Sequence, residues 1–245
     1  MKPSNVRDCS IRDELARWSP KRWAPGSHRL SDSPSAAPLS PVVPHLGILG
    51  RMAAHDEPPM RTTGSRVVYR NNWMVVREDN IVFADGTESI YGVLDKADYA
   101  IVIAAEDGLF HLVEQYRYAC SKRSLEFPMG GWPAGKTGTA EELARAELRE
   151  ETGLTAANWV NLGHLVQSSG YSPQAFDIYL ATELTPGVHN REHTEGDMVH
   201  RPVTEQLFRS LIRDGTITDG PTIAAYAMLQ LHRDEIADRN PSAGA

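Results

Sequence analysis

Five glutamates stand close together in the stretch TAEELARAELREETGL, residues 139–154. A helix over this stretch would place Glu147 and Glu151 on one face, because they are four residues apart, with Glu150 beside them. Like charges at this spacing repel one another by roughly 0.2–0.5 kcal/mol. Glu150 and Glu151 also stand at the negative end of the helix dipole, where a cation would be favoured. Such conflicts with local preferences are typical of functional sites.

A divalent cation between the carboxylates would remove both conflicts. Mg²⁺ prefers oxygen ligands and is commonly held by a few carboxylates together with substrate phosphates. The alternative is a solvated acidic face, on which Arg145 and Arg149 screen the negative charge. Charge and spacing alone leave both interpretations open.

The same stretch carries the signals that begin and end a helix. Thr139 followed three residues later by Glu142 is a capping box, and Gly153 is a C-terminal stop. Leu143 and Leu148 can then face a core. The sequence therefore predicts one helix whose carboxylates gather near its end.

Composition narrows the class of protein. The 245 residues suffice for one sizeable domain and an appendage. No apolar run approaches the roughly 20 residues that span a bilayer, so no membrane partner is expected. A net charge of −7 does not suggest a nucleic-acid binder. Cys9 and Cys120, without a CxxC pattern, indicate a reducing compartment, and the cytoplasm is the predicted location.

The first sixty residues differ from the rest. They hold nine of the sixteen prolines, with serines between them, as in SDSPSAAPLSPVVPHLG. Such a segment buries too little apolar surface to offset the entropy of ordering, so residues 1–60 are predicted to be a disordered tail. An alternative is that translation starts at Met52 or Met60. Residues 61–237 are predicted to form the folded domain and residues 238–245 a flexible end.

From residue 61 the pattern becomes regular. Strands are predicted in SRVVYR, WMVVREDNIVF, ESIYGVLD, YAIVIAA, LFHLVEQYRY, WVNLGHLVQS, AFDIYLATEL and MVHRPV, with a hairpin turn at Asp85-Gly86. Two helices, TEQLFRSLIRDG and PTIAAYAMLQLHRDEIA, close the domain. Strands followed by helices, with one helix in the middle, predict an α+β fold in which a mixed sheet lies between helices.

The segment AELREETGL resembles the core of the Nudix box, G-x5-E-x7-R-E-U-x-E-E-x-G-U, in which U is aliphatic. The matching positions are Glu147, Leu148, Glu150, Glu151, Gly153 and Leu154. The preceding LEFPMGG resembles the E-F-P-A-G segment of the ADP-ribose pyrophosphatase branch. The resemblance covers about residues 61–237 and implies the Nudix fold and a hydrolase.

The chain departs from the box at two of its defined positions. Ala146 stands where the family has the arginine that orients the ligand glutamates. Gly138 stands where the family has an earlier glutamate that supports the metal site, and the loop before the helix is about two residues longer than usual. Arg145 and Arg149 flank the first position, but neighbouring helical residues point about 100° apart.

The resemblance implies a Mg²⁺ site, with Mn²⁺ as an alternative ion. Its ligands would be Glu147, Glu150 and Glu151 with the backbone carbonyl of Met129 or Gly130. Glu150 would thereby also be a catalytic residue.

Hydrolysis of a pyrophosphate also needs a group that takes a proton from water. In ADP-ribose pyrophosphatases, a glutamate on a loop late in the chain does so or joins the metal shell. The matching loop is HNREHTEGDMV, in which Glu195 is the first candidate, with Glu192 and Asp197 as alternatives. Three histidines of this region raise Zn²⁺ as a further alternative, although their spacing matches no standard site: His189, His193 and His200.

The segment SSGYSPQAF resembles P-G-x-S-x-E of ADP-ribose hydrolases, with Ser169 for the proline and Gln174 for the acidic residue. Arg117 in VEQYRY matches a basic position of the family and would face phosphate, with a sheet-edge salt bridge as the alternative. Gly130 and Tyr171 would also contact the substrate. Three aromatic residues are candidates for stacking on a base: Tyr118, Trp132 and Tyr171.

The resemblance thus implies a Mg²⁺-dependent hydrolase of a small nucleotide, with ADP-ribose cleaved to AMP and ribose 5-phosphate. GDP-mannose and NADH are alternative substrates, and a non-catalytic nucleotide sensor is an alternative of another class, favoured by Gly138 and Ala146. An isopentenyl diphosphate isomerase would need a proton-transferring cysteine, and Cys120 does not match that pattern. Members of this branch are generally homodimers, so a homodimer is expected, through the strands between Arg66 and Asp95.

Overall fold

The computed structural model describes residues 58–133, 135–191 and 196–239. The tail predicted over residues 1–60 lies outside the described residues as far as residue 57. Residues 240–245 of the predicted flexible end lie outside them as well. No helix among the described residues is long and apolar enough to cross a membrane.

The first sheet has three antiparallel strands in the order β1-β2-β3: β1 (Met60–Arg70), β2 (Val75–Phe83) and β3 (Glu88–Asp95). The hairpin predicted at Asp85-Gly86 joins β2 to β3 and is confirmed. Gly86 has a φ of 85°, and an Asp85 carboxylate oxygen accepts a hydrogen bond from Thr87 N at 2.9 Å. A left-handed φ favours glycine at this position.

The second sheet is mixed and has the order β10-β5-β4-β9-β8, with β6 paired to β5 and β7 to β4. Strands β4 and β9 run parallel, and the other pairs are antiparallel. Its strands are β4 (Tyr99–Glu106), β5 (Leu109–Arg117), β6 (Lys122–Glu126), β7 (Met129–Gly130), β8 (Thr155–Val166), β9 (Ala175–Thr185) and β10 (Val199–Thr204). A 3₁₀ turn, η1 (Tyr118–Cys120), follows β5.

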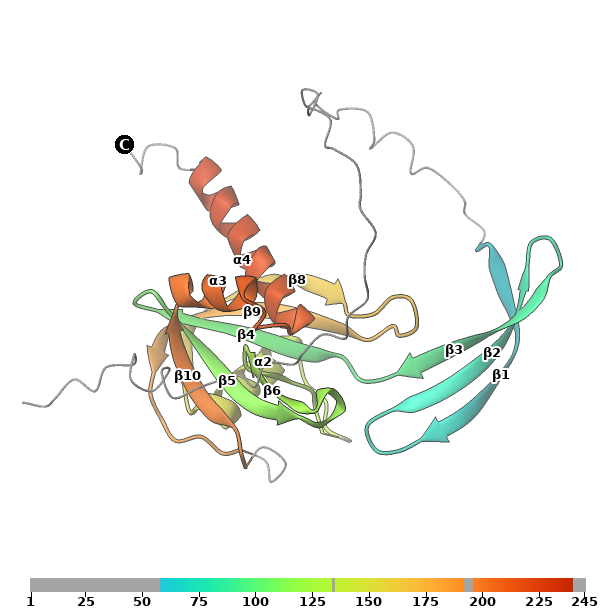
Figure 1. The fold of residues 1–245 in the computed structure, drawn as a ribbon, viewed down its shortest axis with the longest axis horizontal. Helices are drawn as coiled ribbons and strands as arrows, with labels where there is room; N and C mark the ends of the chain where they lie inside the picture. Colours follow the sequence, from blue (N-terminus) through green and yellow to red (C-terminus); the bar gives the residue numbers. More distant parts are fainter. Residues whose placement is uncertain (1–57, 134, 192–195, 240–245) are drawn as a thin grey trace, which may run out of the picture. The chain divides into compact units, whose positions relative to one another are not determined.

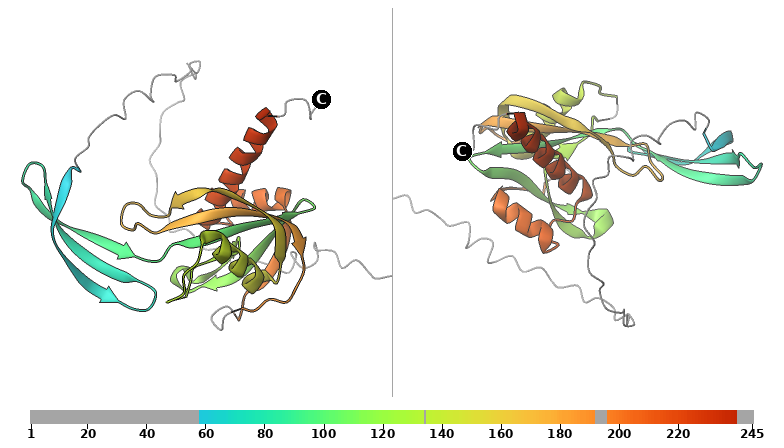
Figure 2. Two further views of the ribbon diagram at one scale, coloured as in Figure 1. Left: turned by 180° about the vertical axis from the view of Figure 1, so that it is seen from behind. Right: turned by 90° about the horizontal axis from the view of Figure 1, so that it is seen from above.

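Helices cover both faces of this sheet. Successive side chains of its central strand point to opposite faces, and both sets are apolar and buried under helices. Ala100, Val102 and Ala104 of β4 pack with α2 (Ala140–Thr152). Ile101 and Ile103 pack instead with α3 (Glu205–Arg213) and α4 (Gly220–Arg239). Figures 1 and 2 show α2 on the face opposite α3 and α4. The predicted α+β sandwich, with a mixed sheet between helices, is confirmed.

The predicted strands and helices are all present, and two short strands were not predicted. Strand β6 pairs with β5 and β7 with β4, and β7 and the last two residues of β6 belong to the LEFPMGG segment, which was interpreted only as a motif. Their sequences, KRSLE and MG, lack the alternation that marks a half-buried strand. Strand β7 is defined by its pairing with β4, which is distant from it in sequence, so no local pattern predicts it.

A pair of histidines joins β5 to β10. His111 Nδ1 and His200 Nε2 are 3.0 Å apart, and the two rings are stacked with their centroids 5.1 Å apart. Burial lowers the pKa of both imidazoles below the ordinary value, and the neighbouring His111 and Arg191 help bring the pKa of His200 to about 4. Both rings are therefore neutral in the folded protein at neutral pH.

This pair makes the stability of the fold sensitive to acid. The unfolded chain binds protons at these histidines below about pH 6.5, whereas folded His200 stays neutral until about pH 4. The contribution is therefore complete above about pH 6.5 and is lost as the pH falls toward 4. We expect His200→Gln to lose less stability than the wild type between pH 7 and pH 4.5 in urea unfolding. His232→Gln on α4 is the control, and identical pH dependence in all three proteins would contradict the prediction.

Candidate active site

Helix α2 begins and ends as its sequence predicts. Thr139 Oγ1 accepts a hydrogen bond from Glu142 N at 3.1 Å, and the Glu142 carboxylate accepts one from Thr139 N at 2.8 Å. Gly153 ends the helix with a φ of 80°, and its N–H donates to Arg149 O. Leu143 and Leu148 are buried. The capping box and the glycine stop are confirmed.

The buried face of α2 also carries two carboxylates, Glu147 and Glu151. The Glu151 carboxylate accepts a hydrogen bond from Met129 N of β7 at 3.2 Å. A Cβ added to Gly130 would lie 2.5 Å from Glu147 Oε2, so the carboxylate occupies the space that any larger residue would fill. Both carboxylates of this face are thus gathered at the two residues of β7.

Glu150 is half-buried beside them. Among residues 58–133, 135–191 and 196–239, no three carboxylates, imidazoles or thiolates are grouped closely enough to form a metal site by themselves. The donor atoms at β7 are nevertheless those that a hard cation prefers, namely carboxylate and backbone oxygens. The donor chemistry of Glu147, Glu151 and the backbone of Met129 and Gly130 therefore fits Mg²⁺ or Mn²⁺, and the predicted ligand set stays a prediction.

A cleft of about 1310 Å³ opens beside β7. Three of the residues predicted to bind the substrate or the metal line it, namely Arg117, Met129 and Gly130. Tyr118 and Trp132, two of the aromatic candidates, line it as well. The exposed Tyr171 is not among the lining residues, and its backbone instead holds β3, because Leu94 N donates to Tyr171 O at 2.8 Å.

Arg117 faces this cleft in an ion pair with the buried Glu126 of β6, the strand that pairs with β5. Both Arg117 Nε and Nη2 donate to the Glu126 carboxylate. The side chain of Arg117 is 40% exposed and that of Glu126 is 1% exposed, so the guanidinium reaches the cleft while the carboxylate lies beneath it. Arg117 thus makes the salt bridge of the alternative interpretation and also lines the cleft, and its contact with phosphate stays a prediction.

Asp219, which precedes α4, adds a further carboxylate to the cleft. It accepts a hydrogen bond from Thr222 N at 2.8 Å and so caps the helix. Burial, with Glu126 nearby, raises the pKa of Asp219 above its ordinary value. These carboxylates together hold the pKa of Arg117 above its ordinary value, although burial acts against them.

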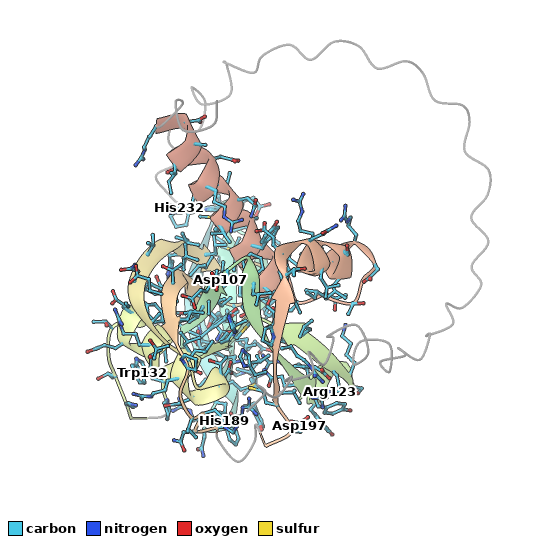
Figure 3. The ribbon with its side chains drawn as sticks, turned by 90° about the vertical axis from the view of Figure 1, so that its left-hand side faces the viewer. Asp107, Arg123, Trp132, His189, Asp197 and His232 are labelled. Carbon is cyan, nitrogen blue, oxygen red and sulfur yellow. The ribbon has the colours of Figure 1, made fainter. Side chains whose placement is uncertain are left out.

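Asp197, an alternative for the general base, is engaged elsewhere. It forms an ion pair with Arg123 at 2.7 Å, and this hydrogen bond lowers the pKa of Asp197 below its ordinary value. A lower pKa makes the carboxylate a weaker base. Figure 3 shows Arg123 and Asp197 near each other at one end of the view and His232 at the opposite end. Glu195, the first candidate, lies outside the described residues, as do Glu192 and His193.

The two departures from the Nudix box have local explanations. A Cβ on Gly138 would lie 2.7 Å from an indole carbon of Trp132, so this ring occupies the space where the family's glutamate would begin. Arg145 does not replace the arginine missing at Ala146. It pairs with Glu141 at 2.8 Å, and its guanidinium carbon lies 4.7 Å from the centroid of the Trp159 ring. Arg149 is exposed.

Sequence reasoning missed Glu126 and Asp219 as site residues. Glu126 stands in the quoted LEFPMGG segment, and Asp219 stands just before a predicted helix, where an aspartate is a common cap. The motif was a usable signal for Glu126. For Asp219, only the fold shows that this cap borders the cleft.

Comparisons with known proteins agree with this architecture. Residues 60–94 match the family model of the nucleoside diphosphate sugar hydrolase N-terminal domain. The chain is 30% identical over 190 residues to an ADP-ribose pyrophosphatase of Mycobacterium tuberculosis, covering 74% of this chain and 86% of the relative. It is 24% identical to a methanol dehydrogenase activator of Bacillus methanolicus, covering 70% and 92%.

A solved structure, described as the crystal structure of ADP compounds hydrolase, has a TM-score of 0.65 and 16% identity and covers 74% of this chain and 98% of its own. This likeness concerns the fold. The similarity to the mycobacterial relative extends over most of both chains. The chain therefore belongs to the Nudix hydrolases, in their ADP-ribose pyrophosphatase-like branch, and the resemblance is confirmed.

The ion pair between Arg117 and the buried Glu126 should contribute measurably to the stability of the fold. Removing one partner of a buried ion pair costs about 3 kcal/mol or more, because the remaining charge loses its partner. We expect Arg117→Ala to lower the free energy of unfolding in urea by about 3 kcal/mol, because it leaves the Glu126 carboxylate, which is 1% exposed, without this partner. Glu78→Ala, which removes the partner of the exposed Arg66, is the control and should cost less than about 1 kcal/mol. Equal losses of stability in Arg117→Ala and Glu78→Ala would contradict the prediction that burial of Glu126 makes its ion pair the costlier one to break.

Proposed function

We propose that this Nudix hydrolase cleaves the pyrophosphate of ADP-ribose, giving AMP and ribose 5-phosphate. The observation that carries the proposal is the gathering of the Glu147 and Glu151 carboxylates at β7, beside a cleft lined by Arg117. The name of the mycobacterial relative, ADP-ribose pyrophosphatase, supports this choice of substrate.

Mg²⁺ is the proposed cofactor, with Mn²⁺ as an alternative. Glu147, Glu150 and Glu151 would hold it, together with the backbone carbonyl of Met129 or Gly130. A bound divalent ion neutralises phosphate charge and lowers the pKa of water. Glycine at position 130 leaves room for the Glu147 carboxylate against the backbone.

The chain's own residues supply binding and proton transfer. Arg117 presents a guanidinium in the cleft, and Glu126 beneath it holds that group in place through two of its nitrogens. A guanidinium fixed in this way can bind phosphate oxygens through its remaining donors. Glu195 remains the proposed general base, since Asp197 is paired with Arg123.

A nucleotide sugar such as GDP-mannose is the second candidate substrate, and NADH is a third. The specific observation that favours a nucleotide sugar is the match of residues 60–94 to a nucleoside diphosphate sugar hydrolase domain. The sensor alternative rests on the departures at Gly138 and Ala146. Direct turnover measurements separate these cases.

The deciding measurement is phosphate-coupled turnover of ADP-ribose, GDP-mannose and NADH with Mg²⁺. We expect ADP-ribose to be hydrolysed fastest. Glu151→Gln should lose most of the rate, because a neutral amide replaces a charged carboxylate ligand. Gly130→Ala should lower the rate about 100-fold, because a displacement of about 1 Å at the reacting groups has such an effect. In Gly130→Ala the added methyl displaces the Glu147 carboxylate, which is the flexible end of a side chain, so the melting temperature should change little.

Gly92→Ala is the matched control, because its added methyl meets nothing within 4 Å. Full activity of Gly130→Ala would contradict the proposed role of Glu147. If another substrate is hydrolysed faster, the proposed substrate ADP-ribose is wrong, but the proposed roles of Glu147 and Glu151 still stand. Binding of nucleotides without turnover of any of them would establish the sensor instead.

We also infer that the protein is a cytoplasmic homodimer. The three-stranded sheet supports the dimer, because almost every residue of β1 and the first half of β3 is exposed. A sheet of this size needs a covered apolar face to be stable. Its exposed apolar side chains are Val67, Val68, Tyr69, Ile90 and Tyr91. The free thiol of Cys120 and the absence of a CxxC pattern suit a reducing compartment.

Light scattering after gel filtration tests the dimer. The wild type should have the mass of two chains, and Val68→Glu should have the mass of one, because a charge in an apolar interface is strongly disfavoured. Ile236→Glu, an equally conspicuous exposed apolar site on α4, is the control and should stay dimeric. A monomeric wild type would contradict the inference.

A further inference from the structure

The C-terminal end of α2 is completed by a distant part of the chain. The last carbonyls of a helix have no partner within it. Here Leu148 O accepts from Thr152 Oγ1 and Arg149 O accepts from Gly153 N. The next two carbonyls are satisfied by residues that follow β9.

Asn190 N donates to Glu150 O at 3.0 Å, and Arg191 Nε donates to Glu151 O at 2.8 Å. The packing here is close, since a Cβ on Gly153 would lie 2.7 Å from Gly187 O and 2.8 Å from His189 N. The segment from Gly187 to Arg191 therefore lies directly against the end of the glutamate helix.

Arg191 makes a second contact that ties this end to the start of β10. Its Nη1 donates to Met198 O, and Met198 is buried immediately before β10. One half-buried guanidinium thus holds two backbone carbonyls, one on α2 and one next to β10. Its positive charge also stands at the negative end of the helix dipole, where a cation is stabilising.

Glu151 is consequently held from two directions. Its carboxylate accepts from Met129 N of β7, and its backbone carbonyl accepts from Arg191. A shift of the last turn of α2 would move the carboxylate relative to β7, because side chain and carbonyl belong to one residue. The geometry of the carboxylate at β7 therefore depends on the backbone contact at Arg191.

We propose that Arg191 is a positioning residue for the hydrolytic site, which acts by fixing the backbone of Glu151 so that its carboxylate stays against β7. The two contacts of Arg191 that carry the inference are both with backbone carbonyls, those of Glu151 and Met198. The inference rests on the proposed function, since it assigns a role toward the same carboxylates.

Two substitutions test it. Arg191→Gln removes the charge and the second donor group that reaches Met198, and Arg191→Lys keeps the charge but not the two-pronged geometry. Arg233→Gln is the control, because Arg233 of α4 is also a partly exposed arginine but pairs with the Glu205 carboxylate of α3 and not with α2. The measurements are kcat and KM for ADP-ribose, Mn²⁺ affinity by calorimetry and, without metal, hydrogen exchange of the Met129 amide.

We expect Arg191→Gln to lower kcat about 100-fold with KM changed less than threefold, as positioning defects do. Mn²⁺ affinity should weaken about tenfold or more, as when groups that orient metal ligands are removed. Arg191→Lys should fall between Gln and wild type. Exchange of the Met129 amide should accelerate in Arg191→Gln, because its bond to Glu151 is loosened, and Arg233→Gln should match the wild type throughout.

Unchanged kcat, Mn²⁺ affinity and Met129 exchange in folded Arg191→Lys and Arg191→Gln would overturn the proposal and leave the proposed function standing. If the wild type binds Mn²⁺ but hydrolyses no ADP-ribose, the proposed function falls, while weakened Mn²⁺ affinity in Arg191→Gln would still support the role of Arg191. A wild type that binds no Mn²⁺ overturns both.

Discussion

Two carboxylates on the buried face of α2 impose the constraint on which this site depends. A helix face that packs on a sheet normally carries apolar side chains, because burying a charge is costly unless it is compensated. Glu147 and Glu151 instead lie beside Leu143 and Leu148 and end at β7. Strand β7 must therefore have a glycine at position 130, because the Glu147 carboxylate occupies the space of a side chain there.

The two faces of the second sheet pack against different helices, α2 on one face and α3 and α4 on the other. Small residues of β4, such as Ala100 and Ala104, allow α2 to lie close on one face. Larger residues, such as Ile101 and Ile103, fill the opposite face under α3 and α4 with a cluster of aromatic rings. Because β7 pairs with the start of β4, the helix that packs on β4 also brings its carboxylates to β7. The packing of α2 on β4 therefore also places the carboxylates of Glu147 and Glu151 at β7.

Other side chains surround the two positions at which the chain departs from the family motif. Trp132 fills the space beside Gly138, and Arg145 turns outward to Glu141 and Trp159. Neither residue replaces the function of the group that the motif would have there. Contacts from outside the motif also reach this region: Glu126 forms an ion pair with Arg117, and Arg191 donates to the backbone carbonyl of Glu151 at the end of the helix.

Local chemistry in the sequence determined the glutamate helix, with its capping box, its glycine stop and the spacing of its carboxylates, because these depend on residues a few positions apart. Alternating strands and the two closing helices followed from periodicity in the same way. Only the tertiary structure decided that Glu126 lies under Arg117, that Asp219 borders the cleft and that Arg191 completes α2. These contacts join segments that strand pairing and helix packing bring together, and no local pattern records which distant partner will satisfy a buried charge or a helix-end carbonyl.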